Sequence, residues 1–116
     1  MPTPSTATSG ANRPAAMGPS QIISELAKLQ GWQLHGDGAE VAIAKTFRFK
    51  NFLRTMAFVN AVAYVAEQQN HHPDMLVQFH SCSIRFNTHD VQGITRADFV
   101  CASLVDALFK PEEQSA

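Results

Sequence analysis

The feature that most constrains the fold of this chain is a hydrophobic period that changes twice. From residue 41 to 49 apolar and polar side chains alternate, which is the pattern of a half-buried strand. From 51 to 69 the apolar residues recur at helical spacing, and from 75 to 88 they alternate again. A strand region, a helix and a second strand region therefore follow one another, and we expect an α+β domain.

Turn signals divide each strand region into a hairpin. Gly36-Asp37-Gly38 precedes the first alternating run, and a short turn near His80-Ser81 interrupts the second. The expected strands cover residues 32–34, 41–49, 75–79 and 82–88.

Helix signals bracket both hairpins. Ser20 is a natural N-cap, and Gly31 lies where a glycine ends a helix. Thr95 can cap the last helix together with Asp98 at the third helical position. Pro73 breaks the central helix because proline disfavours helical geometry in the residue before it. The expected helices cover residues 20–30, 51–69 and 95–110, which completes the order α-β-β-α-β-β-α.

The central helix is apolar on more than one side. Its first stripe consists of Phe52, Met56, Val59, Ala63 and Ala66, and its second of Leu53, Ala57, Ala61, Tyr64 and Val65. In so small a protein one sheet covers only one side of a helix. We therefore expect the second stripe to be buried between copies of the chain.

Length and composition indicate a single domain. The chain has 116 residues, of which 45% are hydrophobic and 16% charged, so it has enough apolar material for one core. We assign this domain to residues 19–110. Residues 1–18, which are mostly small, polar or proline, are expected to form a disordered N-terminal tail, and 111–116 a C-terminal tail.

Charge, hydropathy and cysteine content exclude several classes of partner and site. A formal charge of -1, a pI near 6.5 and the lack of a basic stripe argue against direct nucleic-acid binding. The apolar stretch 52–66 is too short and, with Arg54, too polar for a bilayer of about 30 Å. Cys82 and Cys101 lack CxxC spacing, so neither a disulfide framework nor a thiolate zinc site is indicated, and a reducing, cytoplasmic location is favoured.

Four of the five histidines lie between residues 71 and 89. Imidazoles titrate near neutral pH, so this cluster indicates proton transfer or metal binding. The adjacent His71 and His72 lack the spacing that places two zinc ligands on one face of a helix. A Ser or Cys nucleophile is also disfavoured, because none sits at a recognisable strand-to-helix elbow. We therefore expect acid–base chemistry without a metal.

The histidines belong to a longer pattern of residues. It comprises Glu67, His71, His72, Pro73, Phe79, Thr88, His89, Asp90 and Asp98, together with Gly31-Trp32, Phe47-x-Phe49-x-x-Phe52 and Gly93-Ile94-Thr95. This pattern resembles the pterin-4a-carbinolamine dehydratases over about residues 20–108.

The resemblance implies a fold, an assembly and a reaction. The fold is a four-stranded antiparallel sheet with three helices on one face, and the assembly is a homodimer or homotetramer. The reaction converts a 4a-hydroxytetrahydropterin, a by-product of aromatic amino acid hydroxylases, to quinonoid dihydropterin and water in tetrahydrobiopterin recycling. A proton must reach the leaving oxygen and an N–H proton must leave, which imidazoles accomplish without a metal or cofactor.

The resemblance also implies the site residues. His71, His72 and His89 surround the pterin, with His72 and His89 as general acid or base and His71 mainly positioning. Glu67 and Asp98 support the site by orienting a histidine, or are only a solvated helix residue and a cap. The implied substrate-binding set is His71, His72, Pro73, Thr88, His89, Asp90 and Val91.

Alternatives remain open for several of these residues. The histidine pair by itself is equally compatible with a solvated helix terminus. We expect Trp32 and Phe79 to lie in the core or the cleft wall and His80 to be exposed. Met75 stands where many family members carry tryptophan, so we expect an aromatic wall to be missing. A competing function is a non-catalytic binding module that stabilises a dimer of another protein or assists its assembly, because fold alone does not decide function.

Overall fold

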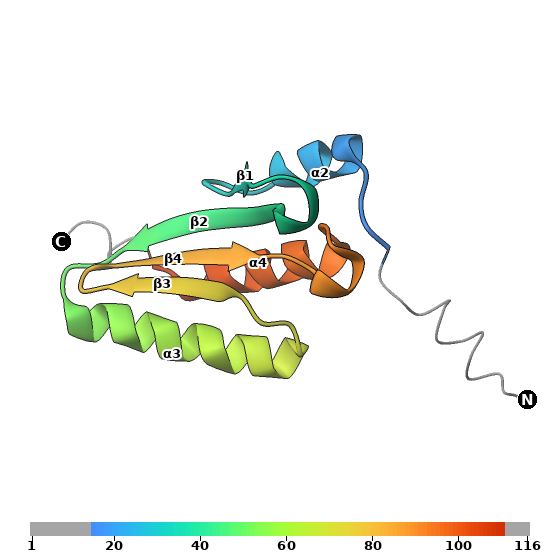
Figure 1. Cartoon of the computed structure of the whole chain (residues 1–116). Coiled ribbons are helices and arrows are strands. Elements are labelled where there is room, and N and C mark those ends of the chain that lie inside the picture. Colours follow the sequence, from blue (N-terminus) through green and yellow to red (C-terminus); the bar gives the residue numbers. More distant parts are fainter. Residues whose placement is uncertain (1–14, 111–116) are drawn as a thin grey trace, which may run out of the picture.

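A computed structural model describes residues 15–110 of the chain (Figure 1). Its four strands form one antiparallel sheet in the order β1-β2-β4-β3, which confirms the predicted α+β fold and both hairpins. The elements, in which η marks a short 3-10 helix, are α2 (Pro19–Leu26), β1 (Gln33–His35), η1 (Gly38–Glu40), β2 (Ala42–Arg48), α3 (Phe52–Gln69), β3 (Asp74–Gln78), β4 (Ser81–Phe86), η2 (His89–Val91) and α4 (Arg96–Leu108).

The hydrophobic core lies between the sheet and the helices. Figure 1 shows α3 and α4 running along the sheet and α2 beside its β1 edge. The core contains Trp32, which is 4% exposed as predicted. The Asp106 carboxylate on α4 accepts from Trp32 Nε1 at 3.0 Å and from Lys45 Nζ at 2.9 Å, so it ties α4 to β2 and to the segment before β1.

The first helix differs from its prediction at both ends. Its N-cap is Gly18 rather than Ser20, because Pro19 is tolerated in the first turn, where its missing N–H has no partner to lose. The helix ends at Leu26, and residues 27–31 form a turn that closes at Gly31 with φ +83.

Part of the predicted N-terminal tail is in contact with the domain. In the described stretch 15–18, the backbone N–H of Met17 donates to the Ile94 carbonyl at 2.7 Å, and Met17 packs on the core. Residues 1–14 and 111–116, which make up the rest of the two predicted tails, lie outside the described residues.

The buried face of α3 differs from both predicted stripes. Phe58 and Val62 belong to neither stripe, yet they are 5% and 0% exposed, whereas Phe52 is 52% exposed. Thr55 is also fully buried, because its hydroxyl donates to the Asn51 and Phe79 carbonyls. Of the second stripe, Leu53, Ala57 and Tyr64 are exposed, and Ala61 and Val65 are partly buried. The buried α3 residues are Thr55, Phe58, Val62 and Ala66.

The second half of the chain shows three further differences. β4 ends at Phe86 rather than at residue 88, and Thr88 forms an isolated bridge with Gly93. For α4, helical spacing in the sequence predicts an apolar face of Ala97, Val100, Cys101, Leu104, Val105 and Leu108, but the buried residues are Asp98, Phe99, Cys101, Ala102 and Val105. Phe79 was expected in the core or cleft wall but is 64% exposed, because β3 ends one residue earlier and Phe79 lies in the turn.

Candidate active site

The exit of α3 carries two adjacent imidazoles. The helix stops because Asn70 adopts the left-handed conformation, with φ 50 and ψ 44, three residues before Pro73. Asparagine is among the few side chains that favour this conformation. The His71 backbone N–H then donates to the Ala66 carbonyl at 3.1 Å, which closes the helix. Asn70 rather than Pro73 therefore ends α3 and sets the direction in which His71 and His72 leave it.

The ring of His71 is held by a buried carboxylate. Its Nε2 lies 2.6 Å from Asp98 Oδ1, and Asp98 is 0% exposed. The other carboxylate oxygen accepts from the Thr88 hydroxyl at 2.7 Å and from the Thr95 backbone N–H at 2.9 Å. The His71 ring also stacks on Phe86, with centroids 6.0 Å apart and planes 12° apart. The ring is thus fixed in both orientation and position.

Asp98 has two functions in this arrangement. By accepting from the Thr95 N–H it caps α4, as the sequence predicts. By accepting from His71 it also joins the start of α4 to the end of α3. An ionised carboxylate only accepts hydrogen bonds, so His71 Nε2 carries the shared hydrogen. In the neutral imidazole, Nδ1 is then left as an acceptor.

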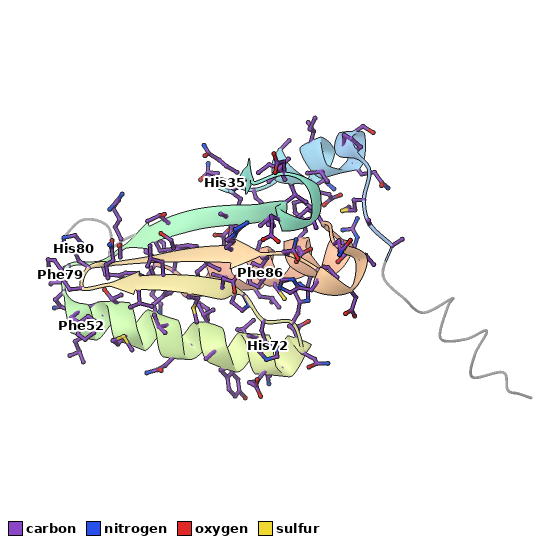
Figure 2. The ribbon with its side chains drawn as sticks, viewed as in Figure 1. His35, Phe52, His72, Phe79, His80 and Phe86 are labelled. Atoms are coloured by element: carbon purple, nitrogen blue, oxygen red, sulfur yellow. The ribbon has the colours of Figure 1, made fainter. Side chains whose placement is uncertain are left out.

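His72 has a carboxylate partner in a different environment. Its Nε2 lies 2.6 Å from Glu67 Oε2, and the two side chains are 55% and 77% exposed. Glu67 lies in the last turn of α3, five residues before His72. In Figure 2 His72 lies at the C-terminal end of α3. Of the two neighbouring imidazoles, one is therefore rigidly held and largely buried while the other faces solvent.

The third histidine lines the same pocket from a different segment of the chain. His89 opens η2, directly after the Thr88–Gly93 bridge, and is exposed. No side chain within residues 15–110 hydrogen-bonds its ring. The pocket has a volume of about 280 Å³ and is lined by Asn70, His71, His72, Asn87, Thr88, His89 and Asp90.

Most residues of the implied site meet in this pocket, and four do not line it. Pro73 and Val91 flank the lining segments, and Glu67 and Asp98 lie behind the imidazoles that they bond. The sequence interpretation missed two lining residues, Asn70 and Asn87. Their only signal was position, directly before the histidine pair and directly before Thr88-His89. Asn87 donates from Nδ2 to the Val41 carbonyl, which holds the end of β4 against the start of β2.

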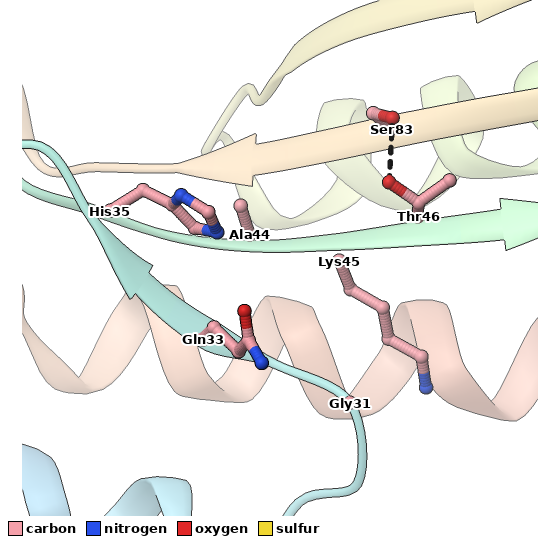
Figure 3. A pocket seen from close by; sticks show the side chains of 7 residues that line it. All are labelled: Gly31, Gln33, His35, Ala44, Lys45, Thr46 and Ser83. Atoms are coloured by element: carbon pink, nitrogen blue, oxygen red, sulfur yellow. Dashed lines mark hydrogen bonds between the residues drawn. The ribbon is translucent and has the colours of Figure 1, made fainter.

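A larger pocket elsewhere offers less chemistry. It has a volume of about 460 Å³ and is shown in Figure 3. Its Lys45 extends away from the neighbouring hydroxyls toward α4, where Asp106 binds it, and the Thr46 and Ser83 hydroxyls bond each other at 2.8 Å. We therefore assign the site to the smaller histidine pocket. The larger pocket is lined by Gly31, Gln33, His35, Ala44, Lys45, Thr46 and Ser83.

The structure bears on other chemistries too. Burial raises the pKa of the Cys82 thiol to about 11, and burial with the nearby Asp98 charge raises the pKa of Cys101 to about 11. Neither is a thiolate at neutral pH, so neither is a ready nucleophile. Across residues 15–110, no three His, Cys, Asp or Glu side chains are grouped so that they could hold a metal ion. In the same range no helix has the length and apolar character needed to cross a bilayer.

Comparison with known proteins shows the family of this chain. The sequence model of the family described as "Pterin 4 alpha carbinolamine dehydratase" matches residues 15–108. The chain belongs to this family. A curated protein of Paracidovorax citrulli, named putative pterin-4-alpha-carbinolamine dehydratase, is 53% identical over 98 residues, which cover 84% of each chain. A protein of the same name from Stenotrophomonas maltophilia strain R551-3 is 44% identical over 92 residues, covering 79% of this chain and 78% of that protein.

Two solved structures that superpose on this dehydratase-family chain are described with different functions. A transcriptional coactivator/pterin dehydratase from Brucella melitensis superposes with a TM-score of 0.76 and 28% identity, over 81% of this chain and 98% of that chain. A pterin dehydratase-like protein identified as a RuBisCO assembly factor in the alpha-carboxysome superposes with a TM-score of 0.59 and 25% identity. The second match covers 68% of this chain and 89% of the other.

Met75 is the position at which the sequence leads us to expect that an aromatic wall is missing. The residue lies in β3, pairs with Ile84 of β4 and packs partly buried against the core. It is not among the residues that line the histidine pocket. A change of side chain at this position would therefore alter the sheet beside the site rather than the described pocket lining.

Proposed function

We propose that this protein dehydrates a 4a-hydroxytetrahydropterin to quinonoid dihydropterin and water, without a metal or cofactor. The observation that carries the proposal is that His71, His72 and His89 meet around one pocket, two of them backed by carboxylates. The elimination requires one group that protonates the leaving 4a-oxygen and one that removes a proton from the ring nitrogen. Each such acid or base contributes about 10² to 10⁴ in rate.

The exposed histidines suit proton transfer. The Glu67 carboxylate accepts the Nε2 hydrogen of His72, which orients the ring and leaves Nδ1 available in the neutral form. His89 lines the pocket from η2, and no side chain within the described residues hydrogen-bonds its ring. We assign His72 and His89 as the acid and base, and we leave open which of them protonates the leaving oxygen.

His71 is better suited to position the substrate. Asp98, Thr88 and Thr95 form a continuous buried network behind it, and Phe86 supports its ring. A ring held on one edge and one face loses little freedom when a ligand binds, so its remaining nitrogen offers a pre-oriented hydrogen bond.

The η2 side of the pocket supplies the polar contacts for the pterin. Asp90 is exposed at the pocket wall, and its carboxylate can accept from the amino and ring N–H groups of a pterin edge. Thr88 offers backbone groups beside it, while Pro73 and Val91 constrain the two lining segments from outside. These contacts would orient the ring so that its 4a-carbon lies between the histidines.

A second candidate function is a binding module that acts on another protein, with or without catalysis. The observation that favours it is the exposed stripe on α3, where Leu53 is 79% and Tyr64 is 65% exposed. The RuBisCO assembly factor among the structural neighbours has the same fold. The same stripe supports a homodimer or homotetramer, in which it would be buried between subunits.

The cellular setting follows from the proposed reaction. An aromatic amino acid hydroxylase would supply the carbinolamine, and a reductase would consume the quinonoid product in tetrahydrobiopterin recycling. Two reduced cysteines and no described membrane-spanning helix suit the cytoplasm.

A dehydration assay on synthetic 4a-hydroxytetrahydropterin tests the proposal. The full-length protein should accelerate the loss of the carbinolamine absorbance over the spontaneous rate, and substitution of His72 and His89 together should abolish the acceleration. A wild-type protein without acceleration would contradict the enzymatic proposal and favour the binding module.

A further inference from the structure

Four parts of the fold meet at the end of the molecule opposite the histidine pocket. They are the end of β2, the start of α3, the β3–β4 turn and the end of α4. The Phe49 N–H donates to the His80 carbonyl at 2.8 Å, and the Thr55 hydroxyl donates to the Phe79 carbonyl at 3.0 Å. The Phe109 ring packs on the Phe49 ring, with the two ring centroids 5.4 Å apart. These contacts bring segments that are far apart in the sequence together at one end of the molecule.

The surface of this end is uniformly basic. We call it the basic end. The segments that build it, 47–55, 78–81 and 107–110, contain no Asp or Glu. The first turn of α3, whose backbone N–H groups add partial positive charge, also has no acidic residue. The exposed basic residues of the basic end are the Arg and Lys residues Arg48, Lys50, Arg54 and Lys110, together with His80.

Large apolar side chains lie among these cations. Phe52 is 52%, Leu53 79% and Phe79 64% exposed. Figure 2 shows Phe52, Phe79 and His80 together at this end. Beside them, a pocket of about 140 Å³ opens between α3 and the end of α4. It is lined by Phe49, Arg54, Ala57, Phe58, Ala61 and Leu108.

We propose that the basic end binds an acidic segment of another protein that carries at least one large apolar side chain. The carboxylates of that segment would meet Arg48, Lys50 and Lys110, and its apolar side chain would enter the pocket. Complementary charge of this kind speeds association and selects partners. Apolar cavities of about 150 Å³ accept a benzene ring, so the pocket has room for a single side chain.

The shape and size of the surface favour this occupant over others. A lipid bilayer would cover the cations but leave the concave pocket empty. A nucleic acid would extend beyond the basic end and meet a chain whose formal charge is -1. Residues 111–116 of this chain, PEEQSA, carry two acidic residues but no large apolar side chain for the pocket.

The basic end is separate from the proposed dehydration site. α3 has 18 residues, and at about 1.5 Å per residue it keeps its two ends about 27 Å apart. The proposal therefore holds whether or not the protein is a dehydratase, and changes at the basic end should leave dehydration unaltered.

Fluorescence anisotropy with labelled peptides tests the proposal on the full-length protein. The peptide EDELFEDD should bind, and EDESSEDD, which keeps the charge but lacks the apolar pair, should bind at least about tenfold more weakly. Lys50→Glu should weaken EDELFEDD binding by about tenfold or more. The matched variant Lys28→Glu makes the same charge change at an exposed site on another part of the surface and should change affinity by less than about twofold.

Several results would overturn the proposal. Equal affinity for the two peptides would mean that the pocket takes no part, and equal loss in the two lysine variants would mean that the surface takes no part. Tighter binding to phosphatidylserine vesicles or single-stranded DNA than to EDELFEDD would assign the basic end to a different partner. A large gain in peptide affinity on removal of residues 111–116 would identify the chain's own terminus as the occupant.

Discussion

The two ends of α3 differ in how their charged side chains are used. At the C-terminal end, Asp98 and Glu67 each bond an imidazole at 2.6 Å, so both carboxylates have a partner within the protein. At the N-terminal end, Arg48 and Lys50 are exposed in segments without a carboxylate. A bonded carboxylate fixes the position of an imidazole, whereas exposed Arg and Lys side chains can contact another molecule. One helix thus joins the proposed dehydration site to the proposed recognition surface.

We call the C-terminal end of α3, with its histidine pocket, the catalytic end. The largest expected effect is a loss of dehydration activity from changes at this end alone. His72→Ala and His89→Ala should each slow dehydration by about 10², the lower end of what a general acid or base supplies, and the double variant should lose nearly all activity. His80→Ala is the control from the opposite end and should change the rate little, because its ring is exposed and distant. Single-turnover dehydration rates measure all four proteins. Full activity in the double variant would refute the site assignment.

The two carboxylates of the catalytic end should differ strongly in their effect on stability. Asp98→Ala leaves His71, Thr88 and the Thr95 N–H without their buried partner, and removing one member of such a group costs about 3–5 kcal/mol. Glu67→Ala breaks an exposed pair and should cost less than about 1 kcal/mol. Urea unfolding measures both. Should Asp98→Ala fail to fold, Asp98→Asn keeps the shape and should still unfold at lower urea than Glu67→Ala.

The exposed stripe that connects the two ends should decide the oligomeric state. Tyr64→Glu places a charge in the stripe and should shift the protein toward monomers at micromolar concentration. Ile23→Glu is a matched control, because Ile23 is 67% exposed against 65% for Tyr64 but lies on α2. Light scattering should show smaller particles for Tyr64→Glu only. A wild-type protein that is already monomeric would contradict the expected self-association.

The smallest expected effect concerns metal removal, which should not change the dehydration rate. If the catalytic end works through protons alone, dialysis against a strong chelator should leave the dehydration rate unchanged. Metal analysis of the purified protein provides the control. A stoichiometric metal whose removal abolishes turnover would require a site that the described side chains do not form.

The sequence predicted the fold well because the fold depends on local periodicity. Both hairpins, the end of α3 at Gln69 and the Thr95–Asp98 cap follow from patterns within a few residues of each other. The predicted stripes on α3 missed the apolar Phe58 and Val62, which lie on the buried face between them. They also missed Thr55, which apolar counting overlooks because its burial depends on a hydroxyl that is satisfied by two carbonyls. Burial at that position depends on hydrogen bonds that no periodicity reveals.

The candidate site was partly accessible from the sequence, and the basic end was not. The signature pattern pointed to the histidines, but not to Asn70 and Asn87, which line the pocket because of the turns that hold them. The lack of a basic stripe in the sequence indicates only that direct nucleic-acid binding is disfavoured. The residues of the basic end come from three separate segments, so only the folded chain brings Lys50, His80 and Lys110 to one end.

Because Asp98 both caps α4 and bonds His71, the position of the His71 ring depends on an intact first turn of α4. If the first turn of α4 opens transiently, the carboxylate moves away and the imidazole loses its support at the same moment. Amide exchange at Thr95, whose N–H bonds Asp98 Oδ2 at 2.9 Å, therefore reports how often the site is disassembled in the resting protein. The exchange of this single amide proton would measure, without substrate, the fraction of molecules in which Asp98 holds His71.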